Sequence, residues 1–147
     1  MKKTPIKESD WKWFGHAAHF ICGQWCRFHL ATVVGKYLIS TVGEYWPERQ
    51  AREIFAECRN PVWLAENRHL KGDNFDRAYM KKFGFEEIGL NRKYETMVFK
   101  AGKICDSKEC HCGLPAIDSD NLDFQGYNTA GDAAKGHFEM CREWSAK

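Results

Sequence analysis

The sequence predicts an α+β protein in which an antiparallel sheet is packed by short helices. Three patterns support this: a β-hairpin over residues 26–42, an alternating strand over 92–100, and apolar side chains at helical spacing over 73–83 and 129–144. A chain of 147 residues with 44% hydrophobic side chains can bury one core. We expect a single domain over residues 1–147, with a mixed core in 1–100 and a metal-stabilised subdomain in 101–147.

The hairpin is the first predicted element. Its arms, residues 26–34 and 37–42, are rich in β-branched and aromatic side chains. Gly35-Lys36 separates them, and glycine at the first turn position is typical of a type II′ turn. Because the arms carry few charges, we expect both faces of the sheet to be covered.

Helices are predicted over residues 47–57, 61–67 and 73–83. Asn60-Pro61 combines a capping side chain with proline at the first helical position. Asp73 caps the third helix and Gly84 ends it. The strand over 92–100 places Tyr94, Thr96 and Val98 on one face and Glu95, Met97 and Phe99 on the other, and Gly102 is expected to end it.

The last predicted helix begins near Thr129 and runs to about Trp144. Thr129 and Asp132 resemble a capping box with aspartate in place of glutamate. Gly131 and Gly136 lower the intrinsic stability of the helix by roughly 1 kcal/mol each. Tertiary interactions or a bound ion must therefore hold this helix in place.

Cysteine and histidine spacing in residues 101–147 predicts a metal site. Cys105, Cys110 and Cys112 are followed, after 24 residues, by His137 and Cys141. Thiolate and imidazole are ligands that zinc prefers, and residues four apart on a helix share one face. We expect four of these five residues to bind a structural zinc ion. In the alternative, His137 and Cys141 simply face the core.

A second cluster lies near the N-terminus, where His16, His19 and His29 are candidate acid–base groups. Glu95, a carboxylate in the middle of a strand, is a candidate fourth member. The alternative is that these histidines are hydrogen-bonded core residues and that Glu95 pairs with a surface cation. A further alternative is a second zinc site built from one helical face, comprising His19, Cys22, Cys26 and His29.

Composition and missing motifs exclude several classes of function. A net charge of +2 argues against binding nucleic acid by charge alone, and residues 101–147 carry five basic against eight acidic groups. No apolar window approaches the ~18 residues that span a bilayer, and the lysines near residue 1 precede no apolar stretch. With seven cysteines and no secretion signal, we expect a cytoplasmic protein without membrane contact. P-loop, G-x-G-x-x-G, G-x-S-x-G and H-E-x-x-H motifs are absent.

Two resemblances extend this interpretation. His29 in FHLAT, Ser40-Thr41 and Glu95 in YETMVF loosely resemble the histidine, serine–threonine and glutamate of ADP-ribosyl-transfer enzymes. The runs GHAAHFIC, CRFHLATVVGKYLISTVGEY, KYETMVF and GYNTAGDAAKGHFEMC are similar to small bacteriophage and prophage proteins, which implies no particular activity.

From these observations we expect a zinc-stabilised module that binds a macromolecule, either a protein or a nucleic acid, with a protein favoured. The alternative is a small transferase or hydrolase that uses His16, His19, His29 and Glu95. Tryptophans that lie at the surface are candidate anchors for a partner, and the alternative is that most of them belong to the core; the five are Trp11, Trp13, Trp25, Trp46 and Trp63.

Overall fold

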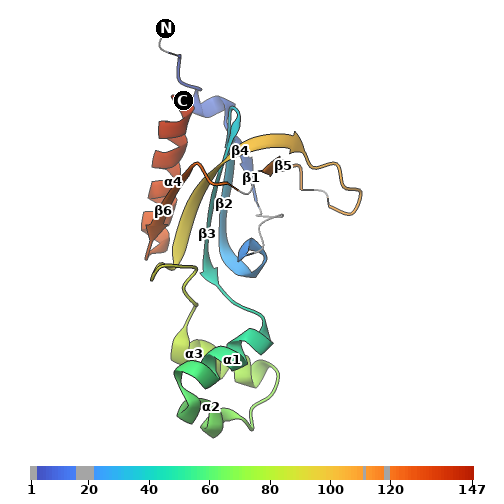
Figure 1. Ribbon diagram of the computed structural model, residues 1–147, viewed down its shortest axis with the longest axis vertical. Coiled ribbons are helices and arrows are strands. Elements are labelled where there is room, and N and C mark those ends of the chain that lie inside the picture. The colour runs from blue at the N-terminus through green and yellow to red at the C-terminus, as the bar shows by residue number, and fades with distance from the viewer. Residues whose placement is uncertain (1–2, 16–21, 111, 118–119) are drawn as a thin grey trace. The chain divides into compact units, whose positions relative to one another are not determined.

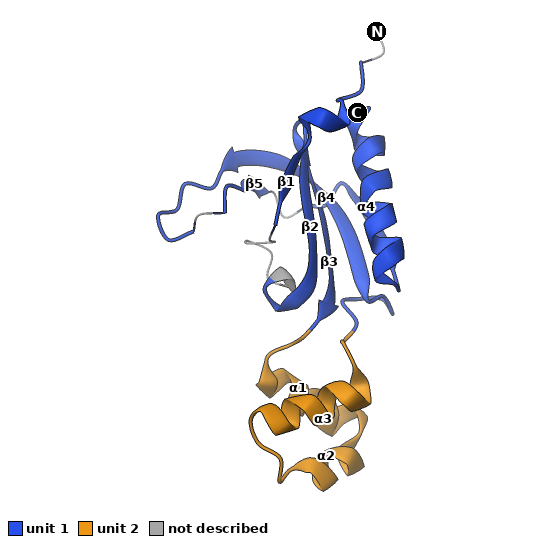
Figure 2. Ribbon diagram, turned by 180° about the vertical axis from the view of Figure 1, so that it is seen from behind, with its two compact units in different colours: residues 1–45, 87–147 blue, residues 46–86 orange. Residues whose placement is uncertain are grey.

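The chain folds into two compact units. The computed structural model describes residues 3–15, 22–110, 112–117 and 120–147. Unit 1 comprises residues 1–45 and 87–147, and unit 2 comprises residues 46–86 (Figure 2). Unit 2 is therefore an insertion between two strands of unit 1. The single domain predicted from the sequence, with a subdomain over residues 101–147, stays a prediction.

Unit 1 is built on a six-stranded antiparallel sheet with the order β1-β2-β3-β4-β5, in which β6 also pairs with β4 (Figure 1). The alternation and hairpin patterns therefore predicted the correct fold class. The strands are β1 (Lys12–Phe14), β2 (Cys26–Val34), β3 (Tyr37–Tyr45), β4 (Tyr94–Ile104), β5 (Pro115–Ile117) and β6 (Asp123–Tyr127), and two short 3₁₀ helices span Glu8–Asp10 and Cys22–Trp25.

The predicted hairpin is confirmed as β2 and β3. Val34 pairs with Tyr37 across the turn, and Gly35 has a φ of 60°, which suits the first position of a type II′ turn. Residues directly opposite each other share a face of an antiparallel sheet. The register therefore places Thr32 and Ile39 on one face, and Ala31 with its partner on the other.

Strand β4 has the predicted alternation but is longer than predicted. Thr96 pairs with Thr41 on the first face, whereas Glu95 pairs with Val42 on the second. The strand does not end at Gly102; it continues to Ile104 because its last part pairs with β5. The first part of β4 pairs with β6, so β5 and β6 pair with successive parts of the same edge of β4.

Helix α4 (Ala130–Ser145) lies along one face of the sheet (Figure 1). As predicted, Thr129 caps it, because the Thr129 side chain accepts a hydrogen bond from the amide of Asp132 at 3.1 Å. The core between helix and sheet is apolar at its centre and consists of Trp11, Val34, Ile39, Val98, Met140, Cys141 and Trp144. This packing joins the C-terminal helix to the hairpin in one unit.

Unit 2 contains three helices, α1 (Arg49–Arg59), α2 (Pro61–Asn67) and α3 (Asp73–Phe83). The predicted bounds of α2 and α3 are confirmed, and Asn60 caps α2 through the amide of Trp63 at 3.0 Å. Gly72, rather than Asp73, occupies the N-cap position of α3. The helices enclose a separate aromatic-rich core of Ala56, Leu64, Phe75 and Tyr79.

Candidate metal centre

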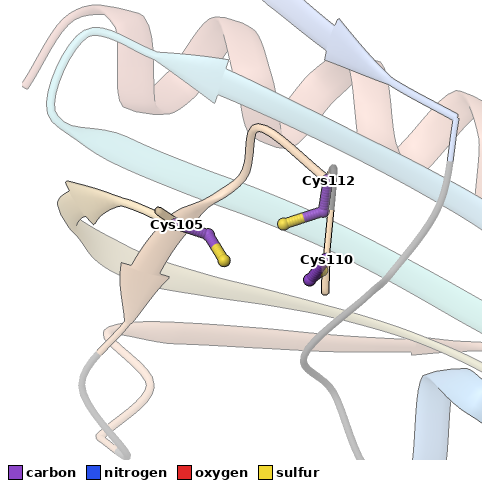
Figure 3. Close-up of side chains that lie close together, drawn as sticks. All are labelled: Cys105, Cys110 and Cys112. Atoms are coloured by element: carbon purple, nitrogen blue, oxygen red, sulfur yellow. The ribbon is translucent and has the colours of Figure 1, made fainter. Parts of the chain in front are cut away.

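Three of the predicted ligands lie together in unit 1. Cys105 directly follows β4, and Cys110 and Cys112 belong to the loop that leads to β5. Their Sγ atoms all lie within 4.8 Å of one another. Figure 3 shows Cys105 and Cys112 with their sulfur atoms directed into the space between them. This group of thiols is the candidate metal centre.

Backbone hydrogen bonds shape the loop that carries these cysteines. The amide of Cys105 donates to the carbonyl of Leu114 at 2.8 Å, which closes the base of the loop. Gly113 has a φ of 66°, a conformation that favours glycine. The turn directs the amide of Leu114 toward Cys112 Sγ at 3.4 Å. This geometry places a backbone amide where it can stabilise a thiolate at Cys112.

The cysteines pack against the sheet face opposite helix α4. Cys112 is buried, whereas Cys105 and Cys110 are half-buried, and all three adjoin an apolar cluster that includes Ala31 and Leu38. Soft thiolate donors suit zinc, copper(I) or an iron–sulfur cluster. Among the described residues, no further Cys, His, Asp or Glu joins the three as a potential ligand.

The structure corrects the other two predicted ligands, because His137 and Cys141 lie elsewhere. His137 Nε2 is 2.8 Å from Thr32 Oγ1, and its Nδ1 is 2.6 Å from Thr41 Oγ1. The Cys141 thiol also forms a hydrogen bond with the Thr32 side chain. Burial raises the pKa of this thiol to about 12. Thr32 and Ala31 are neighbours on β2 and point to opposite faces. The sheet itself therefore separates these two side chains from the three cysteines.

His137 belongs to a buried polar network that was not predicted from the sequence. Thr41 Oγ1 is 2.5 Å from Thr96 Oγ1. The Thr96 side chain in turn forms a hydrogen bond with the phenol of Tyr127. His137 has no exposed surface, and burial lowers its pKa to about 4. The neutral imidazole offers one donor and one acceptor, which matches two hydroxyl partners. Threonines on the helix-facing sides of β2, β3 and β4 were the available signal, but only the strand register shows that they converge.

Two of the four candidate acid–base residues are described, and they share a sheet face. His29 and Glu95 both pair with Val42, so they lie on either side of it in one row. Neighbouring strands lie about 4.8 Å apart, which places the two backbones about 10 Å apart. Burial raises the pKa of Glu95. His16 and His19 lie outside the described residues, so the proposed acid–base cluster remains a prediction.

Comparisons with known proteins add no assignment to this site. No protein-family model matches the chain, and neither a curated protein nor a solved structure matches it significantly. The resemblance to phage proteins therefore stays a prediction. None of the helices in the described part of the chain has the length and apolar character needed to cross a lipid bilayer.

Proposed function

We propose that this chain is a zinc-stabilised module that binds another protein. The zinc part depends on one observation, the convergence of the sulfur atoms of Cys105, Cys110 and Cys112 within 4.8 Å. In a tetrahedral site with Zn–S bonds of about 2.3 Å, neighbouring sulfurs are about 3.8 Å apart. Shifts of about 1 Å would bring the thiols to that spacing, which is small for side chains on an irregular loop.

Zinc fits the setting of these thiols better than the other soft metals do. An iron–sulfur cluster of the common type needs four cysteines, and three converge among the described residues. Zinc accepts mixed sulfur and nitrogen ligands and is not redox-active. In the proposed site, the ion ties the loop after β4 to the sheet and stabilises an irregular segment that has little regular backbone pairing.

Cysteine substitution tests the zinc site. We expect one zinc per chain by elemental analysis, lost when Cys105, Cys110 or Cys112 is replaced by serine. Cys58→Ser and Cys141→Ala are the matched controls, since one changes an exposed thiol of unit 2 and the other a thiol on the α4 side of the sheet. Both controls should keep their zinc. Absence of metal from the wild-type chain, or equal loss in the controls, would contradict the proposal.

Zinc requires a fourth ligand, and cobalt(II) substitution identifies its type. Three thiolates give strong sulfur-to-cobalt charge-transfer absorption, and a nitrogen ligand changes the visible bands without adding to that absorption. His16, His19 and His111 lie outside the described residues, so single His→Ala variants of the cobalt protein test each of them. A variant with altered visible bands and unchanged charge-transfer intensity identifies the histidine.

An exposed aromatic surface formed by β1 and α4 supports the binding part of the proposal. Trp13 is 45% exposed and Phe138 is 39% exposed, and their ring centroids are 5.1 Å apart. The guanidinium of Arg142 lies over the Phe138 ring at 5.8 Å. Exposed aromatic side chains beside an arginine are typical of the residues that dominate protein–protein affinity. The near-neutral charge of the chain favours a protein over nucleic acid.

Affinity capture tests this surface. Proteins retained by the wild-type chain from a nuclease-treated extract should be lost with the Trp13→Ala/Phe138→Ala double variant. Trp25→Ala is the control, because Trp25 is similarly exposed at 42% but lies in a different segment. Retention by the double variant, or binding that nuclease treatment abolishes, would contradict recognition of a protein at this surface.

A further inference from the structure

Unit 2 contains a cavity of about 280 Å³, which is separate from the three cysteines and from the surface around Trp13 and Phe138. Its floor is apolar and consists of Leu64 from α2, Leu70 from the following turn and Phe75 from α3. Leu64 and Phe75 are nearly fully buried, at 6% and 3% exposed, so the floor is part of the core of unit 2. The rim, by contrast, is charged and exposed.

Two carboxylates and one guanidinium form that rim. Glu53 and Glu57 are four residues apart on α1, so they lie on the same face, where like charges repel. Arg68 Nη2 lies 3.6 Å from Glu57 Oε1, with both side chains 65% exposed. Arg49, which precedes Glu53 by one turn, forms its ion pair with Asp76 at 2.7 Å and attracts Glu53 only more weakly, without lining the cavity. The rim therefore has one more carboxylate than guanidinium.

An apolar floor with an acidic rim matches a cation on an alkyl stem. Lysine and arginine side chains place their methylene groups on apolar surface while the charged head remains at the edge. Such a head would relieve the repulsion between Glu53 and Glu57. Arg68 already places its guanidinium at this rim, which makes it an internal competitor for the same carboxylates.

We propose that this cavity binds a lysine or arginine side chain presented by a basic peptide segment of a partner protein. The proposal extends the binding role to the chemistry of a partner, and it depends on neither the zinc ion nor the Trp13 surface. Residues 46–86 have their own core, so the site does not require the metal loop to be ordered. Loss of zinc would leave this binding unchanged.

The test is an NMR titration of the ¹⁵N-labelled full chain with a short capped peptide that contains one arginine between glycines and serines. We expect saturable shifts of amides around Glu53, Glu57 and Phe75. Glu53→Gln should weaken binding by up to about fivefold, because an exposed ion pair contributes at most about 1 kcal/mol. Glu66→Gln is the control, since this exposed side chain on α2 does not line the cavity.

The Arg68→Ala variant gives the sharpest test, because the proposal fixes the direction in which its affinity for the peptide should change. Removing the internal competitor should strengthen binding of the arginine peptide about two- to fivefold, whereas a site for an anion would be weakened. Unchanged thermal melting of each variant shows that folding is not the cause. Absence of saturable shifts, weaker binding by Arg68→Ala, or an equal effect of Glu66→Gln would overturn the proposal. Tighter binding of a free alkyl diamine than of the peptide would overturn the peptide assignment.

Discussion

His137 is a buried imidazole with a hydroxyl group at each ring nitrogen. Thr32 and Thr41 provide these hydroxyls from neighbouring strands, and the ring has no exposed surface. Trp13, which lies on β1, packs over the imidazole, and the two ring centroids are 5.5 Å apart. A protonated imidazole at this position would lose its hydration without gaining a carboxylate partner among the described residues, so the neutral form is favoured.

The pKa of His137 predicts a loss of stability in acid. Burial lowers this pKa from 6.5 to about 4, so between these values the unfolded chain binds a proton that the folded chain does not. The free energy of unfolding should therefore fall as the pH falls from 6.5 to 4, by about 3 kcal/mol for this group. Urea unfolding at pH 7 and pH 4 measures the change.

His137→Gln is the comparison for this experiment, because glutamine keeps a donor and an acceptor but does not titrate. Both proteins are measured with a chelator present, so that metal release at low pH does not contribute. Other titrating groups are common to both proteins and cancel in the difference. An equal pH dependence of the wild type and the variant would contradict a buried, neutral His137.

Individual residues show where prediction from sequence stops. The spacing of His137 and Cys141 correctly placed both on the buried stripe of a helix. The same spacing is compatible with a metal site and with a polar contact to a sheet. Which of the two forms depends on whether the cysteine loop packs on the same face of the sheet as α4 or on the opposite face. Cys105, Cys110 and Cys112 were predictable as a group because short loops keep neighbours in sequence close in space. The fourth ligand that the proposed zinc would need was not predictable, since its position depends on long-range packing.

At the scale of elements, α4 tolerates its two glycines for different reasons. A Cβ atom built on Gly136 would overlap the phenol of Tyr127, whose hydroxyl bonds Thr96. A Cβ atom on Gly131 would have no neighbour within 4 Å. Gly136 therefore allows a close approach between the helix and β6, whereas Gly131 serves no comparable contact among the described residues.

This difference predicts opposite effects of alanine at the two positions. Alanine is favoured over glycine in a helix by about 1 kcal/mol, so Gly131→Ala should stabilise the chain by up to about that amount. Gly136→Ala should destabilise it by roughly 1–3 kcal/mol, because a rigid ring would have to move in a packed interface. Chemical denaturation of the two variants measures both. Stabilisation by Gly136→Ala would contradict the observed packing.

Elements with strong local signals were predicted well. The hairpin, α2 and α3 follow turn and cap residues that act within a few positions, such as Gly35, Asn60 and Gly84. Strands β1, β5 and β6 were missed, because each is short and forms through pairing with a longer strand. The continuation of β4 beyond Gly102 has the same origin.

At the scale of the whole molecule, each unit has its own stabilising centre. In unit 2, Asp76 accepts hydrogen bonds from Arg49 and Arg52, both at 2.7 Å. Burial alone would raise the pKa of Asp76, but the two guanidinium groups hold it below its ordinary value. Arg52 is itself buried and stacks on Trp46 at 4.1 Å. A buried guanidinium depends on this carboxylate for its charge balance.

Asp76→Asn should therefore destabilise unit 2 by roughly 2–3 kcal/mol. We expect faster amide hydrogen exchange in residues 46–86, while the protected amides of β3 and α4 keep their rates. Asp73→Asn, an exposed change in the first turn of the same helix, is the control and should cost less than about 1 kcal/mol. Equal acceleration in both units would show that they unfold together.

The proposed zinc site would link an irregular loop to the sheet of unit 1. X-ray absorption at the zinc edge of the purified, metal-loaded chain tests it most directly. We expect one bound zinc with three sulfur neighbours at about 2.3 Å and one lighter ligand. A spectrum dominated by nitrogen and oxygen neighbours, or a chain that retains no zinc, would contradict it.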